Sequence, residues 1–325
     1  MSKLIFSLGL IMGGLALGYI LQILNQKGFL RLPLPVPALR KLLQKAGLLF
    51  FMPISFVGAV WIIRIDDIRI VTLPFLCVLA LSLGGVLALG GARIMGLGRK
   101  QTGAYFACGS FSNLGSIGAL VAFVFLGEKG FAIVPLYKLF EETFYYTVGF
   151  PITKYYSTDD TKKEKLLSRL KEVFTDIFVL TALGAVTMGA ILNVAGFERP
   201  VFFGKVTSIF IPVGTFILLV SIGLAMRVSS IRDYFKESLV IAGIKFAVIP
   251  LIIGTIAILL GFGNIDQGLP LKVVLIVSSM PVAFTALVPP SIYDLDIDLA
   301  NACWLTTTLA LVIVIPWLYL LTITL

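Results

Sequence analysis

The sequence predicts an all-α integral membrane protein with ten transmembrane helices, arranged as two inverted repeats of five. Three observations predict this fold: an apolar composition, ten apolar segments of spanning length, and a second half that echoes the first. Hydrophobic residues make up 58% of the 325 residues and charged residues 13%, which is about half the charged fraction of a soluble domain. A soluble enzyme, a nucleic-acid-binding domain and a disordered chain are therefore poor interpretations.

The apolar runs set the expected spans, because a helix needs about 20 apolar residues to cross a bilayer. The first run, residues 4–24, is too long for the apolar region of a signal peptide and lacks a convincing cleavage site. The expected spans are residues 4–24, 45–63, 68–92, 102–126, 131–153, 174–196, 203–226, 237–261, 269–292 and 299–323.

Charge sets the expected orientation. The loops that follow spans 1, 3, 5 and 7 carry most of the 26 lysines and arginines. The positive-inside rule places these loops in the cytoplasm. The expected location is the cytoplasmic (inner) or plasma membrane, with both termini on its outer side. The polar segment 157–172 then forms a cytoplasmic linker between a first repeat, 1–156, and a second repeat, 173–325.

The two halves share short patterns in the same order. Gly18–Gln22 in span 1 resembles Gly189–Asn193 in span 6, and Phe51–Ile54 in span 2 resembles Phe210–Val213 in span 7. Because five is an odd number, the second repeat enters the membrane from the opposite side. Inverted repeats of this kind are typical of secondary transporters.

Spans 4 and 9, which correspond in the two halves, contain the strongest helix-breaking signals. The middle of span 4, within residues 108–118, is small and polar, and Pro281 in span 9 lacks the backbone donor that a helix needs. Unwound backbone survives at membrane depth only where it is buried or lines a cavity, and ions and substrates bind there. The sequence therefore predicts a substrate site at the two breaks. The alternative is a pair of kinked or closely packed helices, since small residues also serve helix contacts.

Charged residues also lie inside the predicted spans. Lys138, Glu141 and Glu142 fall in span 5, and Lys245 falls in span 8. Such residues cost about 2.5–3.5 kcal/mol each at a helix centre, so they should face the protein interior and find partners. Lys138 can pair with either glutamate on one helix face. The four residues form either a neutral structural network or a coupling system, in which one glutamate binds a proton or cation and Lys245 is its partner or the counter-charge of an anionic substrate.

Taken in order, these motifs resemble the auxin efflux carrier family, which includes plant PIN carriers and bacterial malate and malonate permeases. That family is related in fold to the bile acid/sodium symporters. The resemblance covers nearly the whole chain. It rests on Gly18-Tyr19, Pro53, Asn113-Leu-Gly115-Ser-Ile-Gly118, Pro212, Gly223-Leu224, Lys245 before Pro250, and Pro281-Val-Ala283-Phe-Thr285. Two positions depart from the family pattern: Leu120 replaces a usual proline, and Thr285 replaces an asparagine.

The resemblance implies broken, crossed helices 4 and 9 and a substrate site near the crossing. It implies a secondary transporter that moves a small organic anion, either a dicarboxylate or an auxin-like carboxylate, by alternating access. The residues expected to bind substrate are Ser110, Ser112, Asn113, Gly115, Ser116, Ser279, Pro281 and Thr285.

Other functions also fit the sequence. A sodium-coupled carrier of the bile-acid type would need sodium for uptake, and a membrane sensor would bind its ligand without moving it. An enzyme is not expected, because no nucleophile, base and metal set accompanies the two glutamates. No cofactor, metal or nucleic acid is expected, and the coupling ion is H⁺ or Na⁺. The expected partners are a small organic anion and the lipid bilayer, with a homodimer left open.

Overall fold

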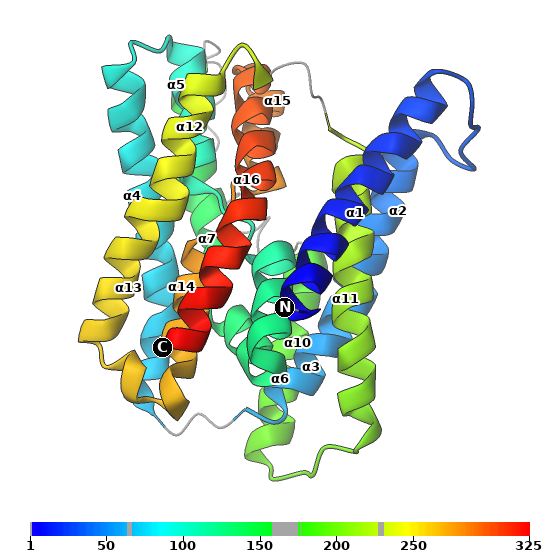
Figure 1. The fold of residues 1–325 in the computed structure, drawn as a ribbon, viewed down its shortest axis with the longest axis vertical. Coiled ribbons are helices and arrows are strands. Elements are labelled where there is room, and N and C mark those ends of the chain that lie inside the picture. Colours follow the sequence, from blue (N-terminus) through cyan, green and yellow to red (C-terminus); the bar gives the residue numbers. More distant parts are fainter. Residues whose placement is uncertain (1, 64–66, 158–174, 176, 227–230) are drawn as a thin grey trace. The chain divides into compact units, whose positions relative to one another are not determined.

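The computed structural model describes residues 2–63, 67–157, 175, 177–226 and 231–325. These residues form helices and one isolated antiparallel bridge (Figure 1). The predicted linker 157–172 lies outside the described residues except for Ser157. The chain divides into two compact units, and each unit takes segments from both halves of the sequence.

Unit 1 comprises Met1–Asp66, Gly115–Pro135 and Ile177–Met226. Within it, α1 packs against α11, and α10 packs against α3. Gly18 and Gly223 let the backbones of α1 and α11 touch, since a Cβ atom at either glycine would collide with the other helix. The helices of this unit are α1 (Ser2–Gln26), α2 (Val36–Ala46), α3 (Met52–Val60), α10 (Ile177–Val194), α11 (Phe202–Gly223) and most of α6 (Ala119–Tyr137).

Unit 2 comprises Asp67–Leu114, Leu136–Asp176 and Arg227–Leu325. Within it, α4 packs against α5, α12 against α16, and α13 against α14. Its helices are α4 (Leu73–Ile94), α5 (Arg99–Ser110), α7 (Glu141–Phe144), α8 (Phe150–Tyr155), α12 (Phe235–Gly243), α13 (Ile249–Leu259), α14 (Leu269–Ser278), α15 (Val288–Ile292) and α16 (Ile297–Thr324).

Wide, π-helical turns join several short helices into longer spans. Each of three such turns ends two residues before a proline. Because proline has no N–H, it cannot make the usual bond to the carbonyl four residues earlier, and the turn before it widens. The turns and their prolines are η1 (Gly47–Phe51) before Pro53, η4 (Tyr145–Gly149) before Pro151, and η6 (Ile244–Val248) before Pro250. Figure 1 shows α12 and α13 continuing as one span through η6.

Eight helices in the described residues are long and apolar enough to cross a membrane, where the sequence predicts ten spans. The difference has a local cause, because α5 and α14 end at interruptions and are short. In addition, one long helical segment, Leu114–Tyr155, covers the second half of predicted span 4 and all of span 5. Gly127, with a φ of 73°, interrupts this segment where the two predicted spans meet.

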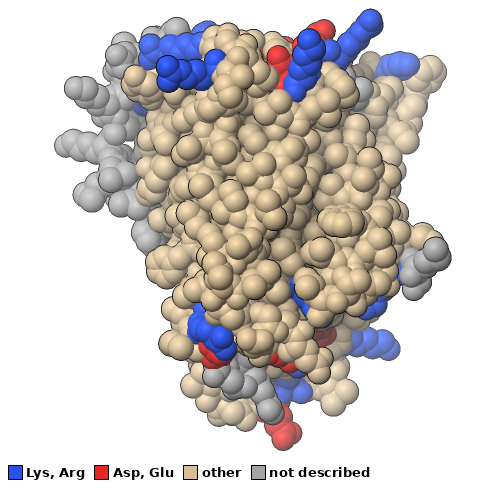
Figure 2. All heavy atoms as spheres, turned by 60° about the vertical axis from the view of Figure 1, so that its left-hand side comes forward, with Lys and Arg blue, Asp and Glu red and all other residues tan. Residues whose placement is uncertain are grey.

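On the face drawn in Figure 2, charged side chains gather toward two opposite ends of an uncharged band.

Candidate functional site

The two interrupted spans of unit 2 pair with each other where they lose their helical structure. The first break follows α5, and the second follows α14. Ser112 and Val282 form the isolated antiparallel bridge. The Asn113 N–H donates to the Pro281 carbonyl at 2.9 Å, and the Ala283 N–H donates to the Phe111 carbonyl at 3.1 Å. We call residues 111–113 and 281–283 the paired breaks.

The bridge leaves the backbone groups of Ser112 and Val282 directed away from each other, because the flanking residues make the interstrand bonds. Side-chain hydroxyls bind these groups. The Ser112 N–H donates to the Tyr145 hydroxyl oxygen at 3.1 Å, and the Val282 N–H donates to Thr307 Oγ1 at 3.2 Å. These bonds satisfy backbone donors that would be costly to leave unpaired in a membrane protein.

Lys245 brings a positive charge to the paired breaks. The residue lies in η6 and is 2% exposed. Its Nζ donates to the Phe111 carbonyl at 3.1 Å and to Ser112 Oγ at 2.7 Å. Both acceptors are uncharged. Among the residues that the structure describes, no carboxylate forms an ion pair with Lys245. Within the described part of the chain, the buried ammonium group therefore has no ion-pair partner.

A second charged group is linked to the same break through Tyr145. The Nζ of Lys138 lies 2.5 Å from Glu141 Oε2, and Glu141 is 3% exposed. The Tyr145 hydroxyl donates to Glu141 Oε1 at 2.9 Å, and it also lies 3.3 Å from the Ser112 carbonyl oxygen. Of the four charged residues that the sequence singled out, Lys245 thus bonds to Ser112 directly, and the Lys138–Glu141 pair is linked to Ser112 through Tyr145.

The other predicted residues are placed differently. The Ser110 hydroxyl donates to the Leu81 carbonyl at 3.0 Å, and the Ser279 hydroxyl donates to the Leu275 carbonyl at 2.8 Å, so both are engaged within unit 2. Thr285 is exposed in the short 3₁₀ helix η9 (Phe284–Leu287).

Three further predicted residues follow the site residues in the sequence. Gly115 and Ser116 lie in the wide turn η3 (Leu114–Gly118), which the chain enters as it passes from unit 2 into unit 1. Glu142 is half-buried and follows Glu141 in α7.

Sequence reasoning missed two residues of this site, Tyr145 and Thr307. Tyr145 follows Glu141 by four residues, which places the two on one helix face, so that spacing was an available signal. Thr307 lies within the apolar span α16, and nothing in its surroundings distinguishes it from its threonine neighbours.

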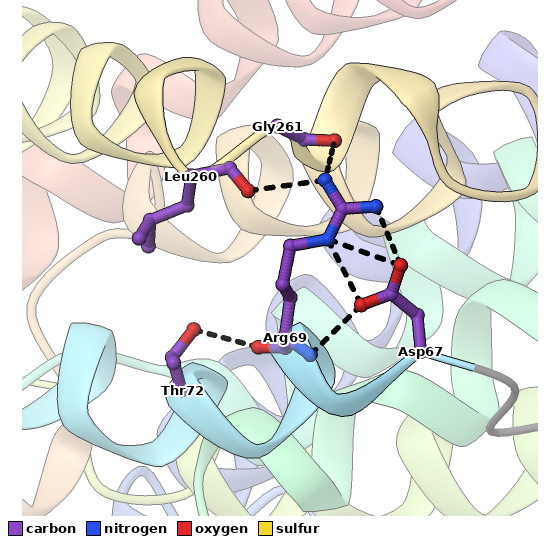
Figure 3. A network of polar contacts seen from close by, with 5 residues as sticks. All are labelled: Asp67, Arg69, Thr72, Leu260 and Gly261. Atoms are coloured by element: carbon purple, nitrogen blue, oxygen red, sulfur yellow. Dashed lines mark hydrogen bonds and ion pairs between the residues drawn. The ribbon is translucent and has the colours of Figure 1, made fainter.

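A separate polar cluster fixes the 3₁₀ turn that precedes α4, η2 (Ile68–Thr72), to the end of α13 (Figure 3). The Arg69 guanidinium binds both carboxylate oxygens of Asp67, and its Nη1 donates to the carbonyls of Leu260 and Gly261 at 3.4 and 3.2 Å. These carbonyls lie at the C-terminal end of α13, where a cation is favourable. The hydrogen bonds from Arg69 lower the pKa of Asp67 to about 2.

Unit 1 has a polar cluster of its own. Arg199 donates to Glu128 at 2.7 Å and to the Gly58 carbonyl at 2.8 Å, and Thr207 also bonds to Glu128. The cluster ties α6, just after its interruption at Gly127, to α3 and α11.

Comparisons with known proteins point to transport. No protein-family model matches the chain. An uncharacterised transporter of Methanothermobacter thermautotrophicus is 24% identical over 252 residues, which cover 76% of this chain and 78% of the relative. An uncharacterised transporter of Methanocaldococcus jannaschii is 26% identical over 262 residues, which cover 78% of this chain and 79% of the relative. Together with the eight apolar helices, these relatives support a transporter role and an integral membrane location.

Proposed function

We propose that this chain is a secondary active transporter that carries a small organic anion, a carboxylate of the dicarboxylate or auxin-like type, through the membrane by alternating access. The transporter relatives support the class of protein. One observation carries the choice of an anion: the buried ammonium of Lys245 has no carboxylate partner among the described residues.

An unpaired charge inside a membrane protein is unfavourable, by about 2.5–3.5 kcal/mol at a helix centre on insertion scales. Such charges are retained where they serve a ligand or an ion pathway. A carboxylate is well suited to Lys245, because it supplies both the missing negative charge and oxygens for an N–H donor. Ser112 and Asn113, at the same break, offer further hydrogen-bonding groups beside the ammonium.

The paired breaks are the proposed substrate site, and they support crossed helices in spans 4 and 9. Both spans lose their helical structure at matching points of the two sequence halves, and their backbones bond to each other there. A hydroxyl from span 5 binds the first break and one from span 10 binds the second, as an inverted repeat would arrange them. In alternating access, one set of helices moves relative to the other and exposes the site to each side in turn.

The first test is binding. Purified protein is heated with malonate, malate or indole-3-acetate, with and without sodium, at two pH values, because a bound ligand raises the unfolding midpoint. We expect one of these anions to stabilise the wild type and not Asn113→Ala or Lys245→Met. Removing one partner of a buried charge pair costs about 2–5 kcal/mol in affinity. Lys205→Met is the matched control, since Lys205 is an exposed lysine of α11.

The second test is uptake of the same radiolabelled anion into vesicles that contain the purified protein. Uptake that Lys245→Met abolishes and Lys205→Met preserves would support the proposal. Binding without uptake would identify a sensor instead, and uptake that requires sodium would identify a sodium-coupled carrier. Wild-type affinity in the Lys245→Met variant would overturn the counter-charge role.

A further inference from the structure

The hydroxyl of Tyr145 lies between a carboxylate and the backbone of the first break. It is 2.9 Å from Glu141 Oε1 and 3.3 Å from the Ser112 carbonyl oxygen, and its own oxygen accepts the Ser112 N–H at 3.1 Å. The residue is 2% exposed. This one hydroxyl therefore joins the Lys138–Glu141 pair to the backbone that also binds Lys245.

A phenolic hydroxyl has one hydrogen and can donate it to one acceptor at a time. Two acceptors compete for it here, Glu141 Oε1 and the Ser112 carbonyl. While Glu141 is ionised, the carboxylate is the stronger acceptor, because a charged acceptor makes a shorter and stronger bond. Once Glu141 is protonated, its own O–H can donate to the Tyr145 oxygen, and the Tyr145 hydrogen is released toward the Ser112 carbonyl.

We propose that Glu141 is the proton-coupling group of the transporter and that Tyr145 is the positioning residue that communicates its protonation state to the paired breaks. The inference rests on the proposed anion transport and adds the coupling ion to it. A proton from water binds Glu141 and converts its carboxylate to a carboxylic acid. No bond of Tyr145 breaks, since its hydrogen only changes acceptor.

Several titratable and charged groups lie around Glu141 and its two partners. The titratable and charged groups that interact electrostatically with Glu141 or with its immediate partners Lys138 and Tyr145 are Cys77 from α4, Tyr137 from α6, Lys138 from the turn before α7, Glu142 from α7, Tyr145 from η4 and Lys245 from η6.

Protonation of Glu141 removes a negative charge that interacts with Lys245. The ammonium then holds an incoming anion more strongly. By linkage, the anion must raise the proton affinity of Glu141 by the same factor, so the two bind together. Couplings of this kind amount to about 5- to 150-fold in affinity. The expected result is symport of one proton with the anion, in which Lys245 supplies the counter-charge.

The decisive variants are Tyr145→Phe, which removes only the hydroxyl, and Glu141→Gln, which fixes a neutral side chain. Tyr137→Phe is the matched control. Tyr137 is buried and interacts electrostatically with Glu141, yet its hydroxyl has no hydrogen-bond partner among the described residues.

The first measurement needs no substrate. All 17 aspartates and glutamates give a C=O stretch in the infrared when they are protonated, so the Glu141 signal is the difference between wild-type and Glu141→Gln spectra recorded as the pH is lowered. We expect this difference to contain one carboxylic-acid band, Tyr145→Phe to shift the frequency of that band, and Tyr137→Phe to leave it unchanged. Wild-type and Glu141→Gln spectra with the same carboxylic-acid bands at every pH would overturn the proposal.

The second measurement is the pH profile of uptake, with malonate as the labelled anion and a sulfonate analogue that stays ionised throughout as competitor. Wild type and Tyr137→Phe should take up more at low pH. Uptake by Tyr145→Phe should lose most of its pH dependence, and uptake by Glu141→Gln should be pH-independent. A wild-type profile in Tyr145→Phe would overturn the role of Tyr145. An infrared band that behaves as expected without uptake would contradict the proposed transport and leave the proton switch intact.

Discussion

Lys245 combines burial of an ammonium group with hydrogen bonds that, among the residues the structure describes, go to uncharged acceptors only. Its two acceptors, the Phe111 carbonyl and Ser112 Oγ, do not neutralise it. A side chain selected for stability would be better served by an apolar residue of similar size, because the desolvation of a charge exceeds the gain from two neutral hydrogen bonds. The residue therefore indicates a function that requires the charge.

The substitution Lys245→Met tests this at the level of stability. It removes a charge that costs about 2.5–3.5 kcal/mol at a helix centre. The Phe111 carbonyl keeps the Ala283 N–H as a donor. We expect the unfolding midpoint without ligand to stay the same or to rise, while stabilisation by the anion is lost. A large fall in the midpoint of the unliganded protein would show that the ammonium is structural.

Asp67 gives a prediction about pH. Its pKa is lowered to about 2 by hydrogen bonds from Arg69, below the ordinary value of about 3.9 for an unfolded chain. A lowered pKa in the folded state stabilises the protein above the unfolded value, and this contribution is lost as the pH falls through the folded value. The difference in unfolding midpoint between wild type and Asp67→Asn should be constant down to about pH 4 and shrink toward about pH 2.

The control for this titration is Asp294→Asn. Asp294 pairs with Lys100 at 2.5 Å, but its side chain is 87% exposed, and exposed pairs contribute little to stability. We expect Asp294→Asn to have nearly the wild-type midpoint at every pH. A difference for Asp67→Asn that persists unchanged below pH 2 would mean that Arg69 does not act through the ionised carboxylate.

At the level of the element, the wide turn η6 sets the position of Lys245. The turn exists because Pro250 cannot donate to the carbonyl of Phe246, and the Ile249 N–H instead reaches back five residues to Ile244. One extra residue in a helical turn rotates the side chains that precede it relative to those that follow. A local backbone rule thereby directs an ammonium group toward the paired breaks.

Pro250→Ala should allow η6 to close into a regular helix and turn Lys245 away from its acceptors. We expect a folded protein with weakened anion binding, measured by the ligand-induced rise in the unfolding midpoint. Pro316→Ala is the matched control, because Pro316 lies inside α16, a helix of 28 residues that shows no wide turn. Equal losses of binding in the two variants would mean that η6 does not orient the site.

At the level of the whole molecule, each compact unit is assembled from both halves of the sequence. In unit 1, α1 and α3 from the first half pack against α11 and α10 from the second. In unit 2, α5 from the first half packs against α16 from the second. Neither half can therefore bury its own packing surfaces without the other.

We predict that a chain cut in the segment 157–172 folds only when both halves are produced together. The halves should then copurify and unfold in one cooperative transition, because every helix contact within the units is retained. Each half produced alone should aggregate or be degraded. A stable, cooperatively unfolding single half would contradict this prediction, and size-exclusion chromatography with thermal unfolding provides the measurement.

The sequence was informative where local chemistry decides the structure. The small polar run after Cys108 and the proline at 281 fall where α5 and α14 lose their helical structure, and the buried charges reach the first of these breaks. It was uninformative where partners are chosen across the chain. Apolar spans have similar compositions, so the sequence does not predict that α1 packs against α11 or that Thr307 binds the Val282 N–H.

The hydrogen bonds from the paired breaks to the Tyr145 and Thr307 hydroxyls also affect the leakage of ions and water through the protein. An unwound segment in a carrier normally attracts water, and a continuous file of water conducts protons and small ions. Here, the hydroxyl oxygens of Tyr145 and Thr307 accept the N–H groups of Ser112 and Val282, which point away from the bridge and would otherwise bind water. If the chain is a carrier driven by an ion gradient, as proposed, a segment that stays dry in the absence of cargo would keep that gradient from leaking away.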